Sequence, residues 1–171
     1  PPAKNLNELK KVFKTVKKYP KIILKYGFNH RYHSSVQLAK KLINSNKFGK
    51  LQNLRCLYGK SKIVTYEKGE WRSKKKFAGG GILLDQGIHV LDLLRFFNGD
   101  FYEFKGFISN RYWKYDIEDN AFAIMRDKKG IIASVHSSAT QWQHKFRMEI
   151  TLEKALIELN GILSGSKSYG R

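Results

Sequence analysis

The sequence lacks the features that mark disulfide-rich proteins and membrane proteins. Its single cysteine, Cys56, cannot form an internal disulfide, which favours a reducing compartment such as the cytoplasm. No apolar run approaches the roughly 20 residues of a membrane span, so we expect no membrane partner. The chain also begins at Pro1, without a methionine, and we expect it to be part of a longer protein.

Acidic residues are scarce as well. The chain has 14 of them and 33 basic residues, so its net charge is +19. Such a charge can indicate binding to nucleic acid or to an anionic surface. However, 25 of the 33 basic residues are lysines, and they are scattered along the chain. Proteins that read nucleic acid usually favour arginine and clustered basic helices. We therefore expect nucleic acid to be an unlikely partner and most lysines to be solvated.

The first part of the chain predicts a helix followed by a strand. Asn5 can cap a helix from Leu6 to about Lys18, because the apolar residues there recur at helical spacing. A short apolar run over Ile22–Tyr26 predicts a strand that stops at Gly27. One such αβ unit cannot stand alone, so residues 1–27 are expected to be the end of a truncated domain.

The remainder of the chain predicts a second helix and then mostly strands. Ser34 or Ser35 is expected to cap this helix, which runs to about Ser45, and period-two alternation follows from Leu51. Further strands are expected over residues 102–112, 119–126, 131–138, 145–152 and 155–159. Short turns between consecutive strands predict a mainly antiparallel, open sheet with helices on one face, and therefore an α+β domain over residues 28–171.

The most distinctive segment is 79–97, in which three glycines lead into a predicted helix that is apolar almost all round. A narrow polar stripe interrupts it, with Asp85, His89 and Asp92 at positions i, i+4 and i+7. A buried carboxylate and imidazole are costly unless they are paired or used. Asp85 and His89 lie one predicted turn apart, so the carboxylate could orient the imidazole and leave its other nitrogen available as a general base.

The residues alone leave several interpretations of this stripe open. Asp85 and His89 could transfer protons, or they could simply satisfy each other's hydrogen bonds in the core. A metal site would need further ligands such as His30, His33 or Asp92, but no HExxH or comparable spacing is present, and we expect no metal. Nucleophilic catalysis has no support, because the sequence lacks GxSxG and Cys56 is expected to be buried in a strand.

Four further residues are candidates for binding a substrate. Asn29 and Arg31 follow the predicted strand at the carboxyl edge, where ligands sit in open α/β sheets. Trp71 and Arg72 lie in an expected loop and could stack on and pair with a ligand, or could cover the edge of the sheet.

Seven short motifs follow one another along the chain, and their order is more specific than any one of them. They are GFNHRY at 27–32, KFGK at 47–50, Trp71-Arg72, the segment 79–89, NGDF at 98–101, EDNA at 118–121 and the glycine-flanked segment 165–170. Together they resemble the C-terminal part of the Gfo/Idh/MocA family of NAD(P)-dependent oxidoreductases, which act mostly on sugars, sugar nucleotides and inositols.

This resemblance implies a Rossmann domain before the chain, of which residues 1–27 would be the last αβ unit. The family's Asp-x-x-x-His pair falls on Asp85 and His89, which would assist proton transfer from the substrate hydroxyl. The family's lysine, in a Glu-Lys-Pro motif, would lie immediately before Pro1. The phosphate-binding fingerprint GxGxxG is also absent, so the residues that bind NAD or NADP are expected outside this chain and the isolated chain is expected to be inactive.

We therefore expect the catalytic and substrate domain of a dehydrogenase that transfers a hydride between a secondary alcohol of a sugar, sugar nucleotide or polyol and NAD or NADP. The resemblance also implies a homo-oligomer formed through the open sheet face. The expected catalytic residues are Asp85 and His89, and the expected substrate-binding residues are Asn29, Arg31, Trp71 and Arg72. Two alternatives stay open: a non-catalytic dimerisation or assembly module that uses the sheet face, and a basic nucleic-acid-binding domain.

Overall fold

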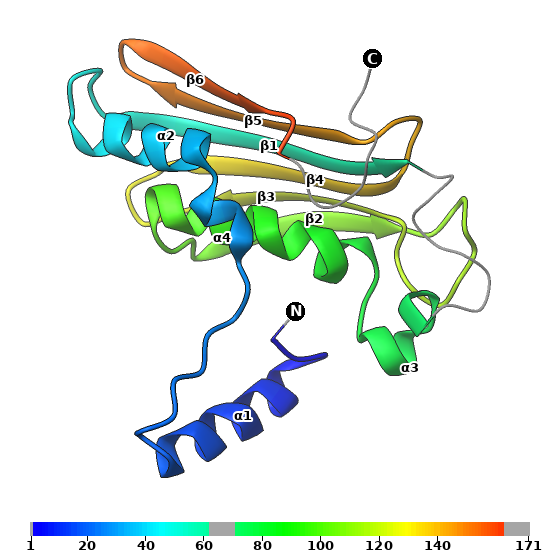
Figure 1. Ribbon diagram of the computed structural model, residues 1–171. Helices are drawn as coiled ribbons and strands as arrows, with labels where there is room; N and C mark the ends of the chain where they lie inside the picture. The colour runs from blue at the N-terminus through cyan, green and yellow to red at the C-terminus, as the bar shows by residue number, and fades with distance from the viewer. Residues whose placement is uncertain (1, 62–70, 163–171) are drawn as a thin grey trace.

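The computed structural model describes residues 2–61 and 71–162, which form one mixed β-sheet and several helices (Figure 1). The helices are α1 (Leu6–Lys18), α2 (Ser34–Asn44), α3 (Lys75–Ala78) and α4 (Ile88–Asn98). Three shorter turns are η1 (Asn29–Tyr32), η2 (Trp71–Ser73) and the π-helical η3 (Leu83–Gly87). The strands are β1 (Leu51–Ser61), β2 (Glu103–Ser109), β3 (Asn120–Arg126), β4 (Ile132–Gln141), β5 (Lys145–Leu152) and β6 (Ala155–Asn160).

The six strands are ordered β2-β3-β4-β1-β5-β6. Four neighbouring pairs are antiparallel, whereas β1 and β4 run parallel. The predicted α+β class is confirmed, and the sheet is mixed rather than purely antiparallel. The sheet is not purely antiparallel because β1 lies in its middle, and the chain then passes through α3 and α4 before it forms β2, β3 and β4. As a result β1 separates β4 from β5, although these two strands are consecutive in the sequence.

The helices α2 and α4 cover one face of the sheet, and the main core lies between them and the strands (Figure 1). Strand β1 shows the expected alternation, because Leu54, Cys56 and Tyr58 are all buried against the helices. Helix α4 contributes four buried apolar side chains, each worth roughly 1.5–3 kcal/mol when withdrawn from water. These are Val90, Leu93, Leu94 and Phe97.

The N-terminal segment follows the prediction only in part. Helix α1 has the predicted bounds, and the Asn5 side chain accepts a hydrogen bond from the backbone N–H of Glu8 at 2.9 Å. The strand predicted over Ile22–Tyr26 is wrong, because this segment belongs to no strand and Ile23 is 92% exposed. A strand needs a hydrogen-bonding partner, and all strands of the described sheet come from residue 51 onward. Helix α1 buries no residue and lies away from the sheet (Figure 1).

Two further findings concern the N-cap of α2 and the length of the helices. Helix α2 begins at Ser34 with His33 at its N-cap position, so neither Ser34 nor Ser35 caps it as predicted. Among the residues that the structure describes, no helix is long and apolar enough to cross a membrane.

Candidate active site

The glycine-led segment forms two elements rather than the single predicted helix. Helix α3 ends just before it at Ala78, with Gly79 as a C-cap whose φ of 84° is left-handed, and the π turn η3 then leads into α4. A Cβ on Gly81 would lie 2.0 Å from the backbone oxygen of Glu118, so only glycine fits there. The Glu118 carboxylate accepts hydrogen bonds from the backbone N–H groups of Gly81 at 2.8 Å and Leu83 at 3.1 Å. Glycine and glutamate together therefore fix the start of the π turn.

Asp85 lies in the π turn η3, and His89 lies in the first turn of α4. The expected hydrogen bond between them is absent, and Nδ1 of His89 is buried without a partner among the described residues. Instead, the Asp85 carboxylate accepts from Nε2 of Gln86 at 2.9 Å and lies 3.6 Å from Nε of Arg72. The catalytic roles of both residues remain predictions.

His89 packs against a second histidine that the sequence suggested only as a metal ligand. His30, in η1, is 1% exposed, and its ring centroid lies 4.5 Å from that of His89 at an interplanar angle of 38°. Tyr58 of β1 and Phe146 of β5 line the other sides of His30, with ring centroids at 5.6 and 6.1 Å. The fold therefore places two imidazoles together where η1, α4 and the sheet meet.

An ion pair holds η1 against α4. Arg31 donates from Nε to Oδ2 of Asp92 at 2.6 Å and from Nη2 to Oδ1 at 2.5 Å. The pair is bidentate, which is the strongest geometry for such a contact, and it raises the pKa of Arg31. Asp92 thereby finds its partner 61 residues earlier in the chain. Arg31, predicted to bind substrate, is in this structure engaged with Asp92.

A second group of site residues, in addition to the two histidines and the ion pair, consists of Trp71, Arg72 and Asp85. The Arg72 guanidinium lies 4.5 Å from the centroid of the Trp71 ring as well as beside Asp85. These three residues line a small hollow together with Ala78, Gly80 and Leu84. Asn29 is exposed and immediately precedes His30 in η1. The structure thus gathers Trp71 and Arg72 beside Asp85, and places Asn29 and Arg31 on the turn that carries His30.

Lys60 of β1 was not predicted as a site residue, but its charge interacts with residues of both groups. Burial lowers the pKa of Lys60, while the negative charge of Asp85 opposes this and Arg72 adds to it. The positive charge of Lys60 also disfavours protonation of both His30 and His89. A signal for Lys60 was present in the sequence, because period-two alternation places it on the same face of β1 as Tyr58.

The electrostatics of the site favour a neutral imidazole at His89. Burial is the largest cause that lowers the pKa of His89 below its usual 6.5, and the carboxylates of Asp85 and Asp92 partly oppose it. Burial also lowers the pKa of His30, to about 4. A half-buried imidazole that is neutral can accept a proton from a bound hydroxyl group.

The remaining sequence predictions concern Cys56, a metal site, and two segments outside the residues that the structure describes. Cys56 is buried in β1, and burial raises the pKa of its thiol, which does not suit a nucleophile. In the ranges 2–61 and 71–162, no group of three or more His, Cys, Asp or Glu residues could hold a metal ion. Pro1 and the motif at 165–170 lie outside the described residues.

Two curated relatives match part of the chain. The glucose-6-phosphate 3-dehydrogenase of Bacillus subtilis is 35% identical over 79 residues, which is 44% of this chain and 22% of that protein. The levoglucosan dehydrogenase of Pseudarthrobacter phenanthrenivorans is 32% identical over 102 residues, or 59% of this chain and 26% of that protein. The matched part of the chain thus spans about a quarter of the length of these relatives.

Solved structures agree over a larger part of the chain. Levoglucosan dehydrogenase in complex with NADH has a TM-score of 0.80 and 25% identity, with 90% of this chain and 44% of that chain covered. Its complex with NADH and levoglucosan has a TM-score of 0.73 and 26% identity, with 78% and 39% covered. An oxidoreductase from Desulfitobacterium hafniense, at a TM-score of 0.82 and 18% identity over 90% of this chain and 44% of that one, shares the fold. The family model described as the GFO/IDH/MocA C-terminal domain matches residues 36–158, well over half of the chain, and the chain therefore belongs to the Gfo/Idh/MocA family.

Proposed function

We propose that this chain is the C-terminal, substrate-binding part of an oxidoreductase that transfers a hydride between a secondary alcohol and NAD or NADP. The observation that carries the proposal is the half-buried imidazole of His89, on the helix that follows Asp85, where burial lowers the pKa of the ring. Family membership and two relatives named as sugar dehydrogenases support a sugar, sugar nucleotide or polyol as the substrate. The NADH complexes of levoglucosan dehydrogenase support the choice of cofactor.

In the proposed oxidation, His89 accepts the proton of the substrate hydroxyl. Bound NAD(P) supplies the acceptor for the hydride that leaves the same carbon, so that a carbonyl group forms. Asp85 and Asp92 stabilise the imidazolium that results, because both carboxylates favour the protonated form of His89. The polar, cationic groups around His89 fit a hydroxyl-bearing ligand, whereas the glycine-rich phosphate fingerprint is not in this sequence. We therefore propose that residues outside this chain hold most of the nucleotide.

The substrate-binding residues are proposed from their placement beside Asp85 and on the turn that carries His30. Trp71 is half exposed and is backed by Arg72, so its ring offers a flat surface for the C–H face of a sugar. Arg31 uses Nε and one Nη2 proton on Asp92, which leaves its Nη1 donors for a ligand oxygen. Asn29 offers an amide on the same turn.

The proposal is tested with the full-length protein, NAD⁺ or NADP⁺, and a panel that includes glucose 6-phosphate, levoglucosan, sugar nucleotides and inositols. His89→Ala should lower kcat by about 10²-fold or more, because it removes the general base. Arg95→Ala is the matched control, since Arg95 is an exposed residue on the same helix and pairs only with Asp100 in the described structure. Unchanged rates for His89→Ala, or no reduction of either cofactor with any substrate, would contradict the proposal.

We also propose the domain division expected from the sequence, with residues 1–27 as the end of a dinucleotide-binding domain and residues 28–171 as the α+β domain. The exposed Ile23 and the absence of buried residues in α1 support a further protein surface against this segment. The isolated 171-residue chain should then not transfer hydride, and measurable turnover by it would overturn this division. The lone, buried Cys56 supports the cytoplasm as the compartment.

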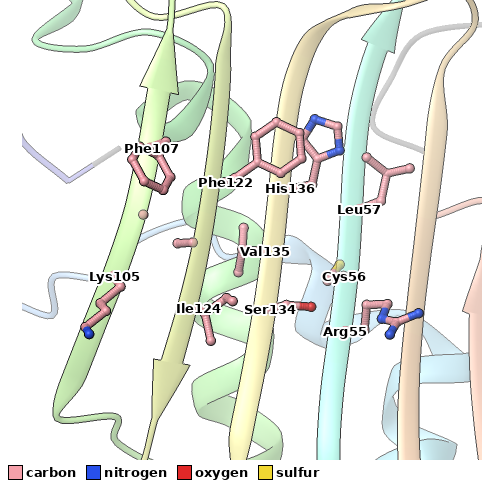
Figure 2. A pocket seen from close by; sticks show the side chains of 12 residues that line it. Arg55, Cys56, Leu57, Lys105, Phe107, Phe122, Ile124, Ser134, Val135 and His136 are labelled. Carbon is pink, nitrogen blue, oxygen red and sulfur yellow. The ribbon is translucent and has the colours of Figure 1, made fainter.

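A second function, assembly through the open sheet face, is favoured by one observation. A shallow pocket of about 620 Å³ lies on the face opposite the helices, and side chains from β2, β3, β4 and β1 line it (Figure 2). Phe107 is 84% exposed and Phe122 is 52% exposed there. Exposed apolar groups that lie next to one another mark interaction sites. We propose that this face joins copies of the chain, in addition to the dehydrogenase role.

A further inference from the structure

The proposed reaction leaves one deeply buried polar side chain without a role. Neither ring nitrogen of His30 has a hydrogen-bond partner in the part of the chain that the structure describes. Buried polar groups are nearly always hydrogen-bonded, so an exception calls for an explanation. The surroundings of His30 are mainly aromatic, and the ring that lies nearest is that of His89.

The contact between the two imidazoles excludes water from one side of His89. A centroid separation of 4.5 Å is at the short end of the range for packed aromatic rings. The ring of Phe28, at 6.0 Å, meets His89 edge-on and encloses it further. Nδ1 of His89 is consequently buried, although the side chain as a whole is only partly so.

The position of His30 is determined by the residue that follows it. Arg31 is joined to Asp92, and Asp92 lies three residues after His89 on α4. Residues three apart on a helix share a face, so the ion pair holds η1 on the side of α4 that carries His89. The ion pair therefore keeps the two imidazole rings in contact.

We propose that His30 is a positioning residue for the proposed reaction, whose uncharged ring packs against His89 and holds that imidazole in its neutral, proton-accepting form. This inference rests on the proposed function, in which His89 is the general base. When the pair takes up a proton during the reaction, His89 carries it. His30 stays neutral because it is the more deeply buried of the two.

Charges from every neighbouring element act on this pair. Lys60 on β1 disfavours protonation of both rings, and His33, between η1 and α2, disfavours protonation of His30. Asp85 on η3 and Asp92 on α4 favour protonation of His89. Arg72 on η2 faces Asp85. Burial is the largest of the causes that lower the pKa of His89.

The test measures the pKa of each histidine by NMR of the full-length protein, labelled at histidine and without substrate. His30→Ala opens space for water beside His89 and should raise the pKa of His89 by about half a unit or more. His30→Phe keeps the ring and should leave the pKa of His89 within about 0.2 units of the wild-type value. His89→Gln should raise the pKa of His30 above about 4, because it removes a competing charge.

The outcomes separate this inference from the proposed function. A folded His30→Ala protein with an unchanged pKa at His89, or a His30→Phe protein that shifts as far as His30→Ala, would overturn it. If His30→Ala does not fold, His30→Asn takes its place, with the same expected upward shift. The acid limb of kcat/KM should move with the pKa of His89 in each variant. Since the titration needs no substrate, the shifts can stand even if no sugar is oxidised.

Discussion

At the scale of single residues, the side chains of the site are held by partners from distant parts of the chain. Arg31 pairs with Asp92, Arg72 with Asp85, and His30 with His89. None of these pairs lies within one turn of a helix. The positions of the functional groups therefore depend on tertiary contacts between η1, η2 and the segment from η3 to α4.

The ion pair between Arg31 and Asp92 should contribute measurably to stability. Asp92→Asn keeps the shape but removes the charge from a carboxylate that is only 10% exposed, while Arg31 is 38% exposed and partly screened by water. We expect a loss of about 1–2 kcal/mol in the free energy of unfolding, measured by chemical denaturation. Asp100→Asn is the control, because both partners in its pair with Arg95 are exposed, and it should change stability by less than about 0.5 kcal/mol. Equal effects of the two substitutions would contradict this role for Asp92.

The sequence identified the polar stripe but not its partners. Asp85, His89 and Asp92 stand out because their neighbours are apolar, and this contrast is visible without a structure. Their partners are separated from them by long stretches of sequence, so no local spacing indicates them. The predicted hydrogen bond between Asp85 and His89 is absent, because the Asp85 carboxylate is engaged by Gln86 and Arg72 instead.

At the scale of elements, the π turn η3 depends on a backbone contact with Glu118. Gly81→Ala would place a Cβ 2.0 Å from a backbone oxygen, which cannot move without displacing the start of β3. We expect a loss of more than about 2 kcal/mol in the free energy of unfolding and lower activity in the full-length protein. Gly27→Ala is the matched control, because nothing lies within 4 Å of the added Cβ, and it should leave stability within about 0.5 kcal/mol. A stable, fully active Gly81→Ala protein would show that the turn tolerates a different path.

Elements with a strong local pattern were predicted closely, whereas their neighbours in space were not. The bounds of β5 match the prediction because its side chains alternate cleanly between the two faces, and Asn5 fixes the start of α1 through its side chain. The parallel pairing of β1 with β4 has no local signature, since it depends on the crossover through α3 and α4. The segment 22–26 has the composition of a strand but no partner strand in the described sheet.

At the scale of the whole molecule, the sheet has one face under helices and one face open. The open face carries a row of apolar or aromatic side chains that crosses four adjacent strands, as Figure 2 shows for Phe107, Phe122, His136 and Leu57. The register joins these residues directly, because Phe107 is opposite Phe122, Phe122 is opposite His136, and His136 is opposite Leu57. Phe122 and His136 stack with centroids 3.8 Å apart. The row is therefore a preformed, rigid surface.

The open face should join two copies of the protein. Phe107→Lys places a charge in the row, and the full-length protein should then change from an oligomer to a monomer when measured by size-exclusion chromatography with light scattering. The reason is that a symmetric interface buries the same residue twice, so one substitution introduces two charges into a surface that excludes water. Ile108→Lys is the matched control, since Ile108 is the next residue of β2, is 69% exposed, and points to the opposite side of the sheet. An oligomer that survives Phe107→Lys, or a wild-type protein that is monomeric, would exclude this face as the interface and leave its apolar row unexplained.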